Sequence, residues 1–154
     1  MSKNSVERSL ILIKPDALQR GLAGEIIKRF ETKGLKIIGL KMIELNDILL
    51  DEHYKHHKDK PFFKNLKNFM KSSPVIVMAL EGPGIVEAIR LIVGSTKGAE
   101  ADAGTIRGDL AMTNQNLVHA SDSADTAKEE IKRFFDEDEL FQYSKADYRL
   151  VFED

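Results

Sequence analysis

Four short apolar segments run along this chain and limit the folds open to it. They are residues 8–13, 35–43, 74–80 and 116–119, each of the length expected for a β-strand. Pro15 stops the first segment, because proline has no backbone N–H to give to a sheet. Stretches with helical spacing separate the four segments. The chain therefore reads as strands interleaved with helices.

The helical stretches carry apolar residues three or four positions apart. The expected helices cover residues 22–33, residues 46–71 in two pieces broken at Pro61, a stretch opened by Pro83, and residues 124–135. Ile26 and Phe30 supply an apolar face in the first of them, and Gly34 stands where a C-terminal cap belongs. Ser123 or Asp122 is placed to cap the last one.

This order of elements reduces to βαββαβ with insertions. We therefore expect an α+β, ferredoxin-like fold, in which helices cover a four-stranded antiparallel sheet on one face. Residues 94–115 contain four glycines and no clear period, and a loop of that length in a compact domain is usually functional. The acidic and aromatic tail from residue 136 is expected to pack on the surface. No repeat or linker interrupts the chain, so one domain over residues 1–154 is expected.

Composition excludes several classes of protein. The net charge of −2 gives no overall basic field that would call for nucleic acid. No apolar run approaches the roughly 20 residues that span a bilayer, and residues 1–7 lack a signal-peptide pattern. Cysteine is absent, which excludes disulfides and thiol chemistry. We expect a cytoplasmic protein without a membrane partner.

Among the residue types of this chain, histidine is the best candidate for catalysis. His119 closes the last apolar segment, and its side chain can act as a base or nucleophile near neutral pH. Taken alone, a histidine at a strand end is more often structural. His53, His56 and His57 share one helical face, a spacing that can bind a transition metal. No carboxylate or thiolate completes that set, so we interpret it as a solvated helix end and predict no metal site.

Five motifs, taken in order, resemble the nucleoside diphosphate kinase family. They are Ile13-Lys14-Pro15-Asp16, His53-Tyr54, Lys60-Pro61-Phe62-Phe63, the run from Gly104 to Asp109, and the run from Asn116 to Ser123. Each motif alone is weak, but the ordered set across residues 7–152 is specific. The resemblance implies the ferredoxin-like fold and a kinase that moves the γ-phosphate of ATP to a nucleoside diphosphate. It also implies a ping-pong mechanism through phosphorylated His119, with Mg²⁺ carried on the nucleotide.

The resemblance assigns the substrate-binding residues. Positions matching Arg90, Thr96 and Arg107 contact the terminal phosphates, which suits arginine because its planar fork forms paired hydrogen bonds. Lys14 and Asn116 match residues that bind the ribose hydroxyls, and Lys14 also adds positive charge. No glycine-rich phosphate loop is present, so side chains would have to hold the nucleotide. Without the resemblance, Arg90 reads equally well as a solvated charge.

Further residues acquire roles in the same way. Phe62 matches the residue that stacks on the base, and Tyr54 matches one near the transferred phosphate. Ser121 and Glu130 match residues that support the imidazole and leave its Nδ1 free to attack. Asp122 is a weaker candidate for contacting Mg²⁺ through water.

The chain departs from the family in loops that pack subunits together. Lys97-Gly98 stands where many members have Asn-Pro, Ala103 replaces a frequent proline, and the stretch 110–115 is one residue short. A homo-oligomer is expected, but its size, tetramer or hexamer, stays open.

Two other classes of function fit parts of the sequence. A hydrolase could use Ser121, His119 and an aspartate, but residues two apart on a strand point to opposite faces, and no Gly-x-Ser-x-Gly motif is present. A ferredoxin-like module could bind RNA or sequester nucleotides. Such modules usually present aromatic residues on the sheet and a basic surface, and the expected strands contain no aromatic residue.

Overall fold

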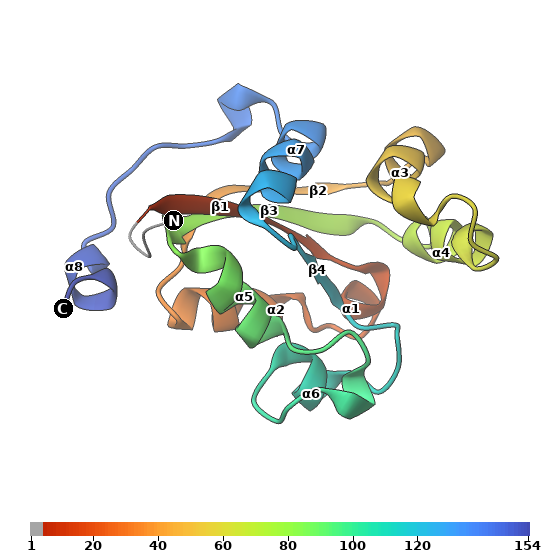
Figure 1. Ribbon diagram of the computed structural model, residues 1–154, viewed down its shortest axis with the longest axis horizontal. Helices are drawn as coiled ribbons and strands as arrows, with labels where there is room; N and C mark the ends of the chain where they lie inside the picture. The colour runs from red at the N-terminus through yellow and green to blue at the C-terminus, as the bar shows by residue number, and fades with distance from the viewer. Residues whose placement is uncertain (1–4) are drawn as a thin grey trace.

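A computed structural model describes residues 5–154 of the protein (Figure 1). Residues 1–4 lie outside the described residues. They belong to the domain expected over residues 1–154 and to the segment, residues 1–7, that lacks a signal-peptide pattern. The elements are β1 (Val6–Ile13), α1 (Pro15–Gln19), α2 (Ala23–Thr32), β2 (Lys36–Ile43), α3 (Asp47–His53), η1 (Lys55–His57), α4 (Phe63–Met70), β3 (Val75–Pro83), α5 (Ile85–Val93), η2 (Gly98–Glu100), α6 (Ile106–Leu110), β4 (Val118–Ala120), α7 (Ala124–Phe134), η3 (Glu137–Glu139) and α8 (Tyr148–Phe152). Among the described residues, no helix combines the length and apolar character needed to cross a membrane.

The four strands form one antiparallel sheet in the order β2-β3-β1-β4. In its register Ile11 lies opposite Met78 on β3, and Leu12 lies opposite His119 on β4. This is the ferredoxin-like α+β arrangement that the order of elements predicts. Because β1 is central, its neighbours bring the start of the chain beside residues more than a hundred positions away.

Helices cover both faces of the sheet, so the expectation of one covered face is wrong. Leu10 and Leu12 pack into one core with residues of α3, α4 and α7, whereas Ile11 and Ile13 pack into a second core with residues of α1, α2, α5 and α6. Figure 1 shows α7 and α3 on one side of the sheet and α2, α5 and α6 on the other. All four β1 residues are fully buried. A strand covered on both sides needs apolar residues at successive positions, which explains the unbroken run.

Two prolines open or close elements differently from the expectation. Pro15 ends β1 but also begins the short helix α1, where a proline at the first position loses no hydrogen bond. Pro83 is the last residue of β3 and does not open a helix. Gly84, with a φ of 58°, turns the chain into α5. The expected loop 94–115 contains η2 and α6, whose short length hides their helical period.

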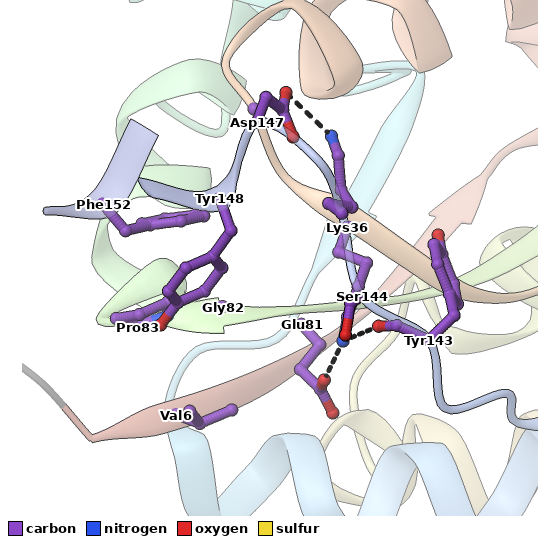
Figure 2. A pocket seen from close by; sticks show the side chains of 12 residues that line it. Val6, Lys36, Glu81, Gly82, Pro83, Tyr143, Ser144, Asp147, Tyr148 and Phe152 are labelled. Carbon is purple, nitrogen blue, oxygen red and sulfur yellow. Dashed lines mark hydrogen bonds and ion pairs between the residues drawn. The ribbon is translucent and has the colours of Figure 1, made fainter. Parts of the chain in front are cut away.

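The C-terminal segment returns to the sheet, as the surface packing expected for the tail requires. The Phe141 N–H donates to the Ile38 carbonyl at 2.8 Å, next to an irregularity in the β2 register. Helix α8, which carries no clear signal in the sequence, closes a cavity of about 360 Å³ over the end of β3. Figure 2 shows the rings of Tyr148 and Phe152 on one side of this cavity and the Lys36–Glu81 pair on the other.

Candidate active site

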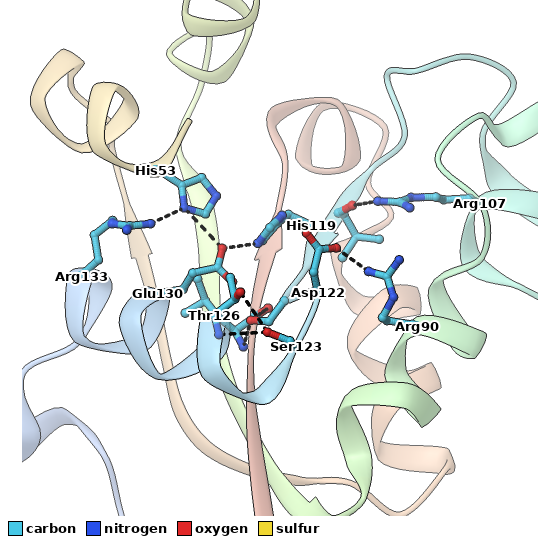
Figure 3. Close-up of polar contacts among 12 residues, drawn as sticks. His53, Arg90, Arg107, His119, Asp122, Ser123, Thr126, Glu130 and Arg133 are labelled. Carbon is cyan, nitrogen blue, oxygen red and sulfur yellow. Dashed lines mark hydrogen bonds and ion pairs between the residues drawn. The ribbon is translucent and has the colours of Figure 1, made fainter. Parts of the chain in front are cut away.

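His119 lies in the middle of β4 and faces a cavity of about 680 Å³. Its Nε2 lies 2.7 Å from Oε2 of Glu130 (Figure 3). An ionised carboxylate only accepts hydrogen bonds, so the imidazole proton belongs on Nε2. In the neutral ring, the lone pair is then on Nδ1. The contact therefore favours, for the neutral imidazole, the tautomer that the family resemblance implies.

A strained residue sets the start of β4. Leu117 has a φ of 73°, a left-handed conformation that costs energy in a non-glycine residue. Its N–H donates to the Asp16 carboxylate at 3.0 Å, and its carbonyl accepts from the Lys14 N–H at 2.8 Å. These bonds hold the strain and shorten the strand, which begins at Val118 rather than at residue 116 as expected. Asp16 is thus a residue that positions the start of β4. It is part of the Lys14-Pro15-Asp16 motif, but no role was predicted for it from the sequence.

Glu130 reaches His119 because α7 starts immediately after β4. The hydroxyl of Ser123 caps this helix by accepting from the Thr126 N–H at 3.1 Å, which confirms Ser123 as the cap. Glu130 lies two turns further on and is 4% exposed. Burial alone would raise its pKa, but the hydrogen bond from His119, helped by the nearby Ser121 hydroxyl and His53, holds that pKa below its usual range. Glu130 is therefore a carboxylate at neutral pH.

Ser121 supports the site from within the protein. It is fully buried, and its hydroxyl accepts from the Leu10 N–H at 2.9 Å. This bond ties the end of β4 to β1. A buried hydroxyl engaged with the backbone cannot reach a substrate, which removes the geometric basis for the hydrolase alternative.

His53 belongs to the site, although only the His53-Tyr54 motif separates it from its neighbours in the sequence and no role was predicted for it. It is the last residue of α3, 6% exposed, and its ring centroid lies 4.7 Å from that of His119. Arg133 donates to its Nδ1 at 3.0 Å. Burial, with the nearby His119, lowers the pKa of His53 to about 3, so the ring is neutral at pH 7. His56 and His57 fall in the separate turn η1, so the three histidines do not share one regular helical face.

Lys14, Thr96 and Asn116 meet on one wall of the cavity. The Lys14 ammonium donates to the Asn116 side-chain carbonyl at 2.8 Å, and the Asn116 amide donates to the Thr96 backbone carbonyl at 2.7 Å. Burial, followed by repulsion from Arg107, lowers the pKa of Lys14 to about 8. The sequence predicted all three residues as substrate ligands, and the structure brings them together from three separate segments.

Arg107 anchors the loop as well as facing the cavity. Its guanidinium donates to the backbone carbonyls of Val118 at 2.6 Å, Gly94 at 3.1 Å and Asn116 at 3.3 Å. Burial, with repulsion from Arg90, lowers its pKa to about 10, so it remains a cation at neutral pH. Thr105 starts the helix α6 that carries it, by accepting from the Gly108 N–H at 2.9 Å.

Arg90 is the more exposed of the two arginines. It projects from α5 and contacts the Asp122 carboxylate at 2.6 Å, with half of its side chain open to solvent. Figure 3 shows Arg90 and Arg107 on the same side of His119, opposite His53 and Arg133. Two arginines and Lys14 thus line the same cavity as the imidazole of His119. This arrangement suits an anionic substrate that presents an electrophile to His119.

The two aromatic candidates differ in position. Tyr54 lines the cavity, is 8% exposed, and burial with the nearby Glu130 raises its pKa well above the usual value. Phe62 does not line it. Its ring is 48% exposed and lies 5.1 Å from the ring of His57, which is part of the cavity wall. Phe63 packs against a core instead, as expected for one of the pair.

Comparisons with known proteins identify the family. The family model for nucleoside diphosphate kinase matches residues 7–140. A nucleoside diphosphate kinase from Methanothermobacter thermautotrophicus is 49% identical over 150 residues, which is 97% of this chain and all of that protein. One from Parabacteroides distasonis is 51% identical over 139 residues, covering 90% of this chain and 91% of that one.

Solved structures give the same result. A halophilic nucleoside diphosphate kinase from Halobacterium salinarum, in complex with CDP, superimposes with a TM-score of 0.94 at 42% identity, over 97% of this chain and all of that one. A transition state mimic of the nucleoside diphosphate kinase from Borrelia burgdorferi, with bound vanadate and ADP, has a TM-score of 0.87 at 30% identity. The match covers 94% of this chain and 96% of that one. The fold, the site and these matches define a phosphotransferase. The chain belongs to the nucleoside diphosphate kinase family.

The buried ammonium of Lys14 leads to a prediction about stability. The folded protein releases this proton near pH 8, whereas the unfolded chain keeps it to about pH 10.5. Between these values the unfolded state binds more protons, so this group makes the free energy of unfolding rise with pH. At pH 7 Lys14 is charged in both states, so the whole cost of burying its charge lowers the free energy of unfolding. We expect Lys14→Met to be more stable than wild type at pH 7, by about 1 kcal/mol, and the difference to shrink toward pH 10. Urea unfolding at both pH values measures it, and a pH-independent difference would contradict the explanation.

The carboxylate of Glu130 leads to a second prediction. Glu130→Gln keeps an acceptor for the His119 proton but removes the charge that stabilises a developing positive ring. We expect phosphorylation of His119 to slow by about 100-fold. Rapid-quench measurement of the phosphoprotein tests this. Glu129→Gln, the adjacent exposed residue on the same helix, is the matched control, and an equal loss in both variants would refute the special role of Glu130.

Proposed function

We propose that this protein transfers the γ-phosphate of ATP to nucleoside diphosphates by a ping-pong mechanism through phosphorylated His119. The observation that carries the proposal is the His119–Glu130 pair, which directs an imidazole proton to Nε2 within a cavity lined by cations. Relatives with bound CDP and bound ADP with vanadate support nucleotides as the ligands.

The chemistry proceeds in two displacements. In the first, Nδ1 of His119 attacks the γ-phosphorus of ATP, a nitrogen–phosphorus bond forms, and the bond to the ADP oxygen breaks. ADP leaves, and a nucleoside diphosphate enters the same cavity. Its terminal phosphate oxygen then attacks the phosphorus, and the bond to His119 breaks. Splitting the reaction in this way lets one site serve donor and acceptor in turn.

The cavity residues hold the nucleotide while this occurs. We assign the terminal phosphates to Arg90, Arg107 and the Thr96 hydroxyl, and the ribose to Lys14 and Asn116. Mg²⁺ arrives with the nucleotide because it prefers phosphate oxygens and water. Asp122, which lines the cavity and pairs with Arg90, is assigned to contact this ion through water. The base is assigned to Phe62, with Tyr54 near the transferred phosphate.

The assembly and setting of the enzyme are also part of the proposal. The edge strand β2 exposes Leu40 and Met42 by 50% and 61%, and such a surface favours association into a homo-oligomer. The absence of cysteine suits a reducing cytoplasm. An RNA-binding role is disfavoured, because both faces of the sheet are already packed against helices.

Initial-rate kinetics test the mechanism. ATP is varied at several fixed GDP concentrations, with excess Mg²⁺. Ping-pong transfer predicts parallel lines in a double-reciprocal plot and exchange of label between ATP and ADP without any acceptor. Intersecting lines with no exchange would show direct transfer between two bound nucleotides and would overturn the proposal.

A further inference from the structure

Two imidazoles and one carboxylate converge at the floor of the active-site cavity. Ligand-type atoms of His53, His119 and Glu130 all lie within 4.8 Å of one another. The phosphoryl transfer proposed above uses His119 and Glu130 but gives His53 no step. We propose that these three side chains form a binding site for a transition metal ion such as Zn²⁺ or Co²⁺. Occupation of this site would inhibit the enzyme.

One of the distances among these ligand atoms already matches such an ion. Two histidine nitrogens and one glutamate oxygen, with water in the fourth position, form a known type of zinc site. Bonds of 2.0–2.2 Å to a tetrahedral ion place the ligand atoms about 3.4 Å apart. Nδ1 of His53 and Oε2 of Glu130 are already 3.5 Å apart. Nε2 of His119 lies closer to the same oxygen, at 2.7 Å, because a proton sits between them. A metal ion that takes the place of this proton, which passes to solvent, would open that distance by about 0.7 Å.

Arg133 should weaken binding of the metal ion, and replacing it therefore provides a test of the site. Its guanidinium donates to Nδ1 of His53 at 3.0 Å, the atom that faces Glu130. Glu52 lies 3.4 Å from the Nε of the same arginine and offers it another partner. A metal ion on His53 must displace Arg133 from the ring and must overcome its positive charge. Removing Arg133 should therefore tighten metal binding, whereas removing His53 should weaken it.

The ligand types separate this ion from Mg²⁺. Imidazole nitrogen favours zinc, cobalt, nickel and copper, while Mg²⁺ prefers oxygen and stays with the phosphates. An ion on Nε2 of His119 would draw electron density from the ring and make Nδ1 a poorer nucleophile. It would also take Glu130 away from the imidazole. The inhibitory consequence rests on the proposed function, but binding of the ion does not.

Cobalt provides a direct probe, because a tetrahedral Co²⁺ ion absorbs visible light. The full chain without nucleotide is titrated with Co²⁺, and Zn²⁺ is then added in competition. We expect one Co²⁺ per chain in wild type, at least tenfold weaker binding in His53→Gln, and severalfold tighter binding in Arg133→Gln. The control is His56→Gln with His57→Gln, which removes two nearby histidines outside the set and should leave the affinity unchanged. Zinc should also slow formation of the phosphoprotein at constant MgATP.

The opposite pattern would overturn the site. Binding lost in the His56/His57 double variant but kept in His53→Gln would assign the ion to the exposed histidines. An absence of visible absorption at millimolar Co²⁺ would exclude the site outright. Thermal melts confirm that each variant is folded, and Arg133→Gln decides the question if His53→Gln is not, since unchanged or weaker binding there contradicts the proposal. Failure of metal binding with normal phosphoprotein formation would refute this inference alone, and the reverse result would refute only the proposed function.

Discussion

Replacing His119 with alanine should lower phosphoryl transfer from ATP to GDP by at least about 10⁴-fold, because loss of a covalent nucleophile removes both steps of the reaction. The remaining side chains of the cavity would still bind nucleotide, since none of the phosphate or ribose ligands is changed. We therefore expect the dissociation constant for ADP to change by less than about fivefold. Steady-state rates and equilibrium titration with ADP measure the two quantities separately.

Folding of the His119→Ala variant needs its own control. His119 is on a three-residue strand, and its ring contacts His53. His119→Asn keeps a polar side chain at the same position and should be equally inactive. A variant that is folded by circular dichroism, binds ADP, and still transfers phosphate at more than a hundredth of the wild-type rate would contradict the assignment.

Replacing Arg107 with alanine should have the largest effect on stability of any residue in the site. Its guanidinium satisfies three backbone carbonyls that fix the loop and the start of β4. Losing hydrogen bonds from a charged donor, and with them partners of partly buried carbonyls, costs about 3 kcal/mol. For a chain of this length that corresponds to a fall in Tm of about 6–12 °C. Activity should fall as well, because the same group faces the cavity.

Arg90 is the matched comparison. It lines the same cavity, but within residues 5–154 its only side-chain bond is an exposed ion pair with Asp122, of a type that contributes about 1 kcal/mol or less. Arg90→Ala should therefore lose activity with little change in Tm. Differential scanning calorimetry of both variants tests this contrast. Equal changes in Tm would show that Arg107 has no special structural role.

Most of the fold could be predicted from the sequence, because the local signals for strands and helices agree with the tertiary structure. The four apolar segments became the four strands, and Ser123 capped the last helix as its position suggested. The sequence did contain a sign that helices cover both faces of the sheet. The run Leu10–Ile13 has no polar residue on either side of the strand, which a sheet open to water on one face would require.

Other features had no local signal. Leucine does not favour a left-handed conformation, so the strain at Leu117 follows only from its bonds to the Lys14–Asp16 turn. The burial of His53 had no local signal, because it depends on where α3 ends relative to α7, some eighty residues later. The double role of Arg107 likewise had no local signal, since the carbonyls it binds come from two separate segments, Gly94 and residues 116–118. Most of the residues that the sequence predicted for the site line one cavity, whereas the contacts that hold them there have no local signal.

The most direct test of the central claim is transfer of label through the protein. The wild-type protein is incubated with γ-labelled ATP and Mg²⁺, freed of nucleotide, and then mixed with GDP. The proposed mechanism predicts one acid-labile, base-stable phosphate per chain, located on His119 and passed to GDP. Label on the protein that persists in His119→Ala, or GTP formed without any labelled protein, would contradict it.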